Sequence, residues 1–241
     1  MKLLNKAGFT IIETMLFLGI TGLLVAGLLV GTGTSISIQR YRDSVKELQS
    51  TLQQQYSDVS NVSNDNSGDL TCYGDGSISP KGQSNCVILG KFITATNSHS
   101  LSVKTVIGRI PLKSVSSLSD EAIFSEEGYN INISTMASST YDIEWGASIV
   151  DKKGIDTSFS MLILRSPSSG VIRTFVDPSR TIADKDIKNL LNTSPSALTQ
   201  SANLCIDSNG LFTGTRNAIF ITANSTGPNG VEVRGDASSG C

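Results

Sequence analysis

Residues 9–30 read FTIIETMLFLGITGLLVAGLLV, and this stretch decides the architecture of the chain. It is almost wholly apolar, and its only charged residue is Glu13. A helix of about 20 residues rises about 30 Å, which matches the hydrocarbon core of a bilayer. The stretch therefore predicts a transmembrane helix. Because Lys2 and Lys6 precede it and a long polar region follows, we expect the N-terminus in the cytoplasm and the remaining chain outside.

Two simpler explanations of this stretch fit less well. A secretory signal peptide carries its cleavage site after the apolar region, whereas here the run is longer and the helical pattern continues without a break. A plain signal anchor gains nothing from a carboxylate at Glu13. Since a charge inside the bilayer costs about 3 kcal/mol or more, Glu13 is a functional-site candidate.

The helix is expected to continue well beyond the membrane. Proline is absent until Pro80, and residues 60–68 are rich in Asn, Ser and Asp, so we expect the helix to end there. The continuation is amphipathic, and its apolar side needs a partner. We favour the rest of the chain over a partner coiled coil. The apolar residues recur at spacings of three and four: Ile38, Tyr41, Val45, Leu48, Leu52, Tyr56 and Val59.

Short β-type runs separated by turns follow a loop-like region at residues 64–86. Residues 184–191 predict a short helix. Strands that follow one long helix without regular alternation imply an antiparallel sheet. The predicted fold class is α+β, with the long helix packed on the sheet. The predicted strands are Val87–Ile93, Ser102–Ile110, Tyr129–Ser134, Tyr141–Val150, Phe159–Arg165, Val171–Val176, Leu204–Asp207, Ala218–Ala223 and Val231–Arg234.

Charge and cysteine content narrow the function classes. The 241 residues include 19 basic and 21 acidic ones, a balance that gives no general attraction to nucleic acid. Four cysteines in an exported domain suggest two disulfides, with three pairings open. We favour Cys72–Cys86 and Cys205–Cys241, because each pair brackets a loop-rich stretch. A zinc site is less favoured, since no pair has C-x-x-C spacing.

The N-terminus resembles the class III signal of type IV prepilins and type II secretion pseudopilins. The matching residues are 6–13, Lys-Ala-Gly-Phe-Thr-Ile-Ile-Glu. The resemblance implies that a prepilin peptidase cuts between Gly8 and Phe9 and methylates the new amine of Phe9. It also implies that Glu13 meets the terminal amine of a neighbouring subunit and aligns it. Because two buried unpaired charges are costly, such a pair sets register more than strength.

The same resemblance divides the chain into four parts. They are a leader at 1–8, a transmembrane and filament-core helix at 9–31, an amphipathic continuation at 32–62, and an extracytoplasmic β-rich domain at 63–241. Relatives are often locally unwound near a glycine or proline in the core helix, so Gly22 is a candidate for such a break. The chain departs from many relatives in carrying Val30 where they carry a proline.

A weaker resemblance covers the C-terminal residues. Residues 204–210, 218–222 and 231–234 are similar to the end of the H-type minor pseudopilins and T-type minor pilins. The pattern predicts a hairpin whose turn contains Asn209 and Gly210. It favours a minor subunit of the filament.

Residues that could carry chemistry are few. His99 lies in a polar turn and is expected to be exposed, so it is a poor catalytic candidate. The acid pairs at 120–121 and 126–127 are typical of a solvated surface. Residues 75–76 and 207–210 could hold calcium, but plain turns are favoured. We predict no catalytic residue, no metal site and no cofactor.

The sequence therefore favours an assembly protein and not an enzyme. It is expected to be a single-pass protein of the inner membrane that later joins a pilus or pseudopilus, with other pilin subunits and a membrane assembly platform as partners. Two alternatives stay open: a DNA- or surface-binding tip subunit, and a membrane-anchored extracellular enzyme. The tip alternative needs the scattered arginines to converge: Arg165, Arg173, Arg216 and Arg234.

Overall fold

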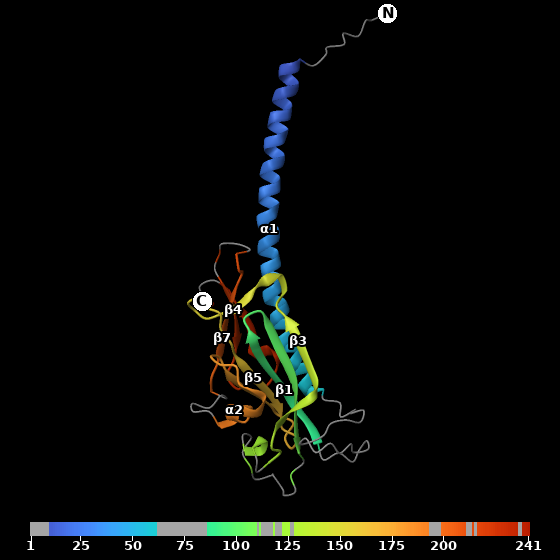
Figure 1. Ribbon diagram of the computed structural model, residues 1–241, viewed down its shortest axis with the longest axis vertical. Coiled ribbons are helices and arrows are strands. Elements are labelled where there is room, and N and C mark those ends of the chain that lie inside the picture. The colour runs from blue at the N-terminus through green and yellow to red at the C-terminus, as the bar shows by residue number, and fades with distance from the viewer. Residues whose placement is uncertain are drawn as a thin grey trace, which may run out of the picture.

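The computed structural model describes residues 10–61, 86–109, 111, 118, 122–125, 128–192, 199–210, 214, 216–235 and 238–241. Figure 1 shows one long helix, α1, whose C-terminal half packs on a β-rich domain and whose N-terminal half projects from it. The α+β class predicted from the sequence is confirmed. The predicted cleavage site, Gly8 and Phe9, lies outside the described residues.

Helix α1 (Ile11–Ser60) is continuous. It begins after Thr10, whose hydroxyl accepts a hydrogen bond from the N–H of Glu13 at 3.3 Å and so caps the first turn. It ends at the start of the predicted polar region, where the Arg165 guanidinium donates to the carbonyl of Ser60 at 3.1 Å. The unwinding expected at Gly22 is not present. Glycine weakens a helix but keeps its backbone N–H, and only proline would remove that donor.

The predicted apolar stripe of α1 is buried against the domain. Its residues from position 41 onward are at most 2% exposed, and Ile38, nearest the projecting half, is partly exposed. The domain therefore supplies the partner for this face, as the sequence analysis favours over a coiled coil. The fully buried members are Tyr41, Val45, Leu48, Leu52, Tyr56 and Val59.

Sheet A contains five described strands in the order β3-β2-β1-β5-β6, and all neighbours are antiparallel. Its outer face is covered by a 3₁₀ turn, η1 (Ala122–Phe124), and by the region of the predicted short helix. That region forms a 3₁₀ turn, η3 (Asp184–Asp186), and a helix, α2 (Asn189–Asn192). The strands are β1 (Cys86–Asn97), β2 (Ser100–Arg109), β3 (Asn132–Asp142), β5 (Ser160–Arg165) and β6 (Ile172–Asp177).

A second antiparallel sheet, sheet B, has the described order β4-β7-β8-β9, whereas the sequence analysis expects a single sheet. The predicted strand 141–150 is divided between the two sheets by a 3₁₀ turn, η2 (Glu144–Gly146). Trp145 and Gly146 have φ angles of 58° and 72°, which no strand accommodates. The strands of sheet B are β4 (Ser148–Val150), β7 (Ala202–Asp207), β8 (Asn217–Ile221) and β9 (Val231–Arg234).

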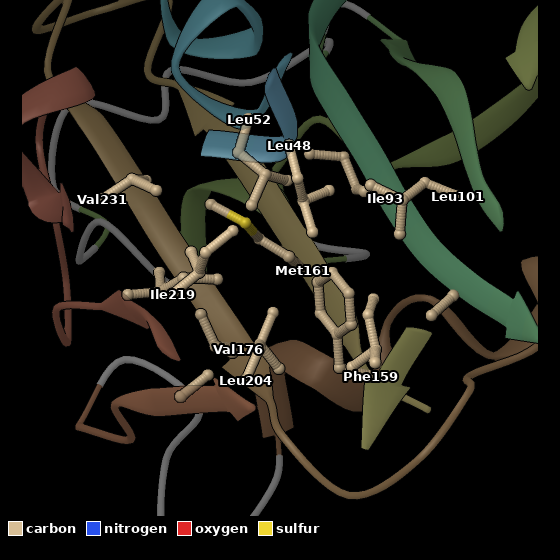
Figure 2. Close-up of a cluster of buried hydrophobic side chains, with 14 of the residues drawn as sticks. Leu48, Leu52, Ile93, Leu101, Phe159, Met161, Val176, Leu204, Ile219 and Val231 are labelled. Carbon is tan, nitrogen blue, oxygen red and sulfur yellow. The ribbon is translucent and has the colours of Figure 1, made fainter. Parts of the chain in front are cut away.

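The main hydrophobic core joins α1 to both sheets. Figure 2 shows Leu48 and Leu52 of α1 above side chains from sheet A, such as Met161, and from sheet B, such as Ile219. These residues are fully buried. The helix thus lies where it can contact both sheets at once, and the core depends on its presence.

Helix α1 also covers the edge of sheet B. The side-chain amides of Gln49 and Gln53 both donate to the backbone carbonyl of Val231, at 3.1 and 3.0 Å. Val231 begins the edge strand β9, which pairs only with β8 among the described strands. The two glutamines therefore satisfy an acceptor that the sheet leaves open, and they fix the height of the helix on the domain.

Candidate membrane and assembly segment

The N-terminal half of α1, from Ile11 to about residue 39, is not covered by the described domain, and we call it the bare half. Its large apolar side chains are between 49% and 77% exposed, and the helix is long and apolar enough to cross a membrane. An apolar surface of this extent is rarely left in water, so it needs lipid or other helices around it. The exposed side chains are Ile11, Ile12, Met15, Leu16, Phe17, Leu18, Ile20, Leu23, Leu24, Val25, Leu28, Leu29, Val30 and Ile36.

Glu13 lies in the first turn of this bare segment. Its backbone N–H is bonded to the Thr10 hydroxyl, and its side chain is exposed. Residues 14–39 contain no charged side chain, so the next charge along the helix is Arg40. A carboxylate is favourable near the N-terminal end of a helix dipole. Glu13 is therefore the charged residue in the first turn of a helix whose next 26 residues, 14–39, are uncharged.

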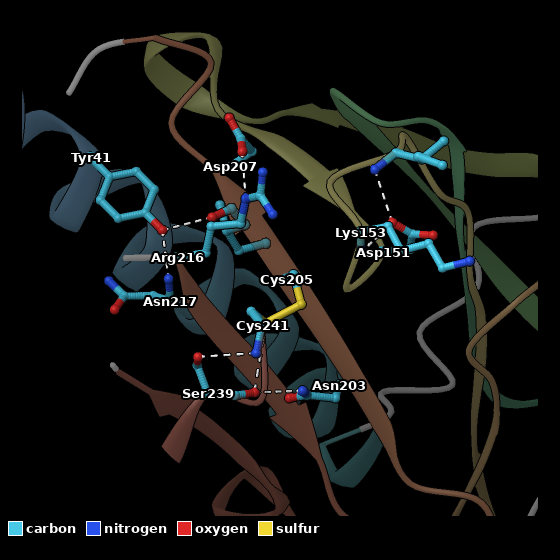
Figure 3. The surroundings of a disulfide bond; sticks show 12 residues. Tyr41, Asp151, Lys153, Asn203, Cys205, Asp207, Arg216, Asn217, Ser239 and Cys241 are labelled. Carbon is cyan, nitrogen blue, oxygen red and sulfur yellow. Dashed lines mark hydrogen bonds and ion pairs between the residues drawn. A yellow bond between two sulfur atoms is a disulfide. The ribbon is translucent and has the colours of Figure 1, made fainter. Parts of the chain in front are cut away.

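The bare half meets the packed half at Tyr41. Its hydroxyl donates to the carbonyl of Ile206 at 2.7 Å and accepts from the backbone N–H of Asn217 at 2.8 Å. Figure 3 shows Tyr41 beside Asn217. Burial raises the pKa of the Tyr41 phenol above its ordinary value, and the hydrogen bond from Asn217 offsets part of this rise. The tyrosine thus ties α1 to strands β7 and β8 at the top of the domain.

An ion pair lies beside this junction. The Nε of Arg216 is 2.6 Å from a carboxylate oxygen of Asp207, and the other oxygen accepts from the backbone N–H of Asn209 at 2.7 Å. Burial alone would raise the pKa of Asp207, but these hydrogen bonds outweigh it and lower the pKa below its ordinary value. Asn209 and Gly210, predicted in the turn of a hairpin, lie in the longer connection between β7 and β8, and both have positive φ.

The C-terminus is fastened to sheet B by a disulfide. Cys205 on β7 is bonded to Cys241, with a Cα–Cα distance of 5.7 Å (Figure 3). This is the pairing that the sequence analysis favours. Cys86 is also disulfide-bonded, and its expected partner Cys72 lies outside the described residues. In the described part of the chain no cysteine is free.

The four arginines of the nucleic-acid alternative have separate partners. Arg165 and Arg173 lie on neighbouring strands, but Arg173 is paired with Leu164, so the two arginine side chains point to opposite faces. Arg216 and Arg234 belong to the sheet B side of the domain. The four side chains thus have different partners, and Arg165 and Arg173 do not share one face of the sheet. The contacts are Arg165 with the carbonyl of Ser60 (3.1 Å), Arg173 with Asn224 (3.4 Å), Arg216 with Asp207 (2.6 Å), and Arg234 with the Phe220 ring centroid (3.4 Å) and Glu232 (3.7 Å).

The remaining candidates are simple turns where the structure describes them. His99 is exposed in the β1–β2 turn, where its Nδ1 bonds to the Ser98 hydroxyl at 2.9 Å. Across the described residues, no group of three or more His, Cys, Asp or Glu side chains is placed to hold a metal ion. The carboxylate of Asp207 is occupied by Arg216, which disfavours calcium there. Residues 75–76, 120–121 and 126–127 lie outside the described residues.

Comparisons with known proteins add no relative: no family model, curated protein or solved structure matches this chain. The assignment of function therefore depends on the segment itself.

One contact was missed by the sequence analysis. The guanidinium of Arg40 lies 4.7 Å from the centre of the Trp145 ring, at the boundary between the two halves of α1. Trp145 is the only tryptophan, and it precedes a glycine, which indicates a turn. Sequence pattern could have marked this turn, but it could not have placed it against Arg40.

Proposed function

We propose that this protein is a subunit, of the minor kind, of a type IV pilus or type II secretion pseudopilus. It enters the membrane through α1, is processed between Gly8 and Phe9, and is drawn into a filament by packing of its N-terminal helix. The observation that carries the proposal is the division of one continuous helix into a bare apolar half with a single carboxylate and a half built into the domain core.

The bare half suits two successive environments. Lipid covers it first, and the helices of neighbouring subunits cover it afterwards. Transfer between them exchanges one apolar surrounding for another, so little hydrophobic free energy opposes it. The packed half, by contrast, keeps the domain rigidly attached to the helix throughout, because Leu48 and Leu52 cannot leave the core without unfolding it.

In this proposal Glu13 sets the axial position of each subunit relative to its neighbour in the filament. Processing would place a positive amine on Phe9, four residues before the carboxylate in sequence. A carboxylate and an amine in an apolar surrounding are both costly unless they meet. A neighbour displaced along the filament would leave both unpaired, so the charges select one axial offset.

The partners follow from the same steps. They are a prepilin peptidase with methyltransferase activity, other pilin or pseudopilin subunits, and a membrane assembly platform. The domain would lie outside the cytoplasm, where the disulfide at Cys205 and Cys241 can form and persist.

The test is the mass of the N-terminal peptide from host membranes and from sheared filaments. A chain that starts at methylated Phe9 and occurs in the sheared fraction supports the proposal. A chain that keeps Met1 and never leaves the membrane overturns it and favours an anchored protein with another role.

A charge-neutral variant tests register. Glu13→Gln should be processed normally but lose most incorporation into filaments, because the amine of Phe9 loses its partner. Glu47→Gln is the matched control, since Glu47 is an exposed acid on the packed half of the same helix. Normal filament levels for Glu13→Gln, measured by shearing and immunoblotting, would show that register has another source.

A further inference from the structure

Trp145 occupies an unusual position for a large aromatic residue. It is 48% exposed, and its backbone has φ 58° and ψ 21°, in the left-handed region. A bulky side chain adopts this conformation only where its surroundings impose it. Here the strained turn holds the tryptophan partly in solvent. The strain is therefore not offset by burial of the ring in the domain core.

The turn is fixed to the first packed turn of α1. The Ser44 hydroxyl donates to the carbonyl of Glu144 at 3.0 Å, and the Arg40 guanidinium lies over the Trp145 ring at 4.7 Å. The ring therefore stays at the height of Arg40 on the helix. Arg40 is also the first charged residue after the bare segment.

The length of the uncharged segment matches the thickness of a bilayer. Residues 13 to 40 rise by about 40 Å at 1.5 Å per residue. A bilayer with its headgroups is about 40–45 Å thick. Before assembly the charged Glu13 costs least at the cytoplasmic surface of the bilayer, and the helix is long enough to place it there. Arg40 and Trp145 then lie at the level of the outer headgroups.

We propose that Trp145 and Arg40 form an anchor in the outer headgroup layer of the membrane that α1 crosses. The indole ring places its apolar body against the acyl boundary and its N–H among polar headgroups, which is the position that tryptophan prefers. The Arg40 guanidinium can reach lipid phosphate while it stacks on the ring. The anchor sets the depth of the subunit before assembly, and it deepens the proposed function, since it requires α1 to span a bilayer.

The charges near Trp145 indicate which lipid headgroups the proposed anchor can bind. Asp142 precedes the turn, Glu144 begins it and Asp43 follows on α1, and these three exposed acids balance the basic residues Arg40 and Arg42. This end of the domain is therefore not a basic patch that needs anionic lipid. Zwitterionic phosphatidylcholine, with its phosphate and its interfacial region, is enough for the contact.

The fluorescence of the only tryptophan tests the proposal directly. The full chain is placed in phosphatidylcholine vesicles whose lipids are brominated either near the headgroup or near the chain end, and flotation checks insertion. Emission of Trp145 should be quenched several-fold more strongly by the shallow bromines than by the deep ones. It should also be shielded from aqueous iodide.

The chain offers a matched control. Phe220 is another partly exposed ring with an arginine over it, Arg234 at 3.4 Å. Phe220 pairs with Glu232, and the neighbouring Val231 accepts a hydrogen bond from Gln49 on α1. Gln49 lies about 13 Å farther along the helix than Arg40, on the side away from the proposed membrane. The double variant Trp145→Phe, Phe220→Trp should therefore show no quenching by either lipid.

Each other outcome of the quenching experiment overturns either the anchor, the membrane helix or the proposed function. A floated chain whose Trp145 is unquenched by shallow bromines and open to iodide has no anchor. A change of emission seen only in filaments would assign the turn to a subunit contact and reject the membrane anchor. A chain that does not float would overturn both the anchor and the membrane helix. Quenching in vesicles without processing after Gly8 in the host would instead leave the anchor and overturn the proposed function.

Discussion

The two halves of α1 share one backbone but differ in what covers them. Up to Ile36 the apolar side chains are about half exposed or more, whereas Leu48 and Leu52 are 0% exposed. The difference shows that helix formation and helix burial are separate events in this chain. The domain completes only the second half, and the first half remains a surface that another molecule must complete.

Polar side chains follow the same division. In the bare half, hydroxyls bond within the helix, as when Thr21 donates to the carbonyl of Phe17 at 2.8 Å and Thr32 to that of Leu28 at 3.0 Å. In the packed half some polar side chains also reach other elements, as the Ser44 hydroxyl and the Gln49 amide do, while the Gln55 amide bonds within the helix. A segment that satisfies its own polar groups suits an apolar surrounding, where no water can bond to them.

The largest difference should appear when one leucine of each half is replaced and the two variants are compared. Leu52→Ala should lower the free energy of unfolding by about 2–5 kcal/mol, because it leaves a cavity in the main core. Leu24→Ala, at a side chain that is 59% exposed, should leave it unchanged. Urea unfolding of the full chain in a mild detergent measures both. Equal losses would mean that the bare half also packs on the domain.

The disulfide should have the next largest effect, confined to the domain. Replacing both Cys205 and Cys241 by serine should reduce domain stability by about 2–4 kcal/mol, because the unfolded chain loses a constraint across 36 residues. Circular dichroism should show that the bare helix keeps its helicity in detergent. Unchanged unfolding midpoints would show that the C-terminal tail contributes no stability.

Acid should weaken the junction by the smallest amount. The pKa of Asp207 is lowered by its bonds to Arg216 and Asn209, so its contribution to stability is present above the unfolded value and is lost as the pH falls through the folded one. Stability should begin to fall as the pH approaches the ordinary Asp pKa of about 4 and should continue to fall below it, because the folded-state pKa is lower. Urea titrations should show a shallower fall for Asp207→Asn. An identical slope would indicate that Asp177, whose pKa is also lowered, dominates.

The sequence anticipated the helix better than the sheets. The spacing of Tyr41, Leu48 and Tyr56 is a local property of a helix with 3.6 residues per turn, and their burial followed it. The assignment of strands to two sheets depends on contacts between distant segments. The break at Trp145 shows the limit most clearly, since residues 141–150 contain a β-like pattern that a turn against α1 interrupts.

The candidate site likewise has features that the sequence predicts and contacts that it does not. Glu13, the bare apolar run and the pairing of Cys205 with Cys241 could be read along the chain, because charge, hydropathy and loop spacing are local. The contacts of Tyr41 with Ile206, and of Arg40 with Trp145, join residues separated by more than a hundred positions.

The sequence by itself determined that this protein has a long helix with an uncovered apolar half, because periodicity and composition act within a few turns. Only the tertiary structure decided where that half ends. The end is set at Arg40 and Tyr41, where the backbone of sheet B and the η2 turn contact the helix. These contacts depend on packing between distant segments, which no local pattern specifies.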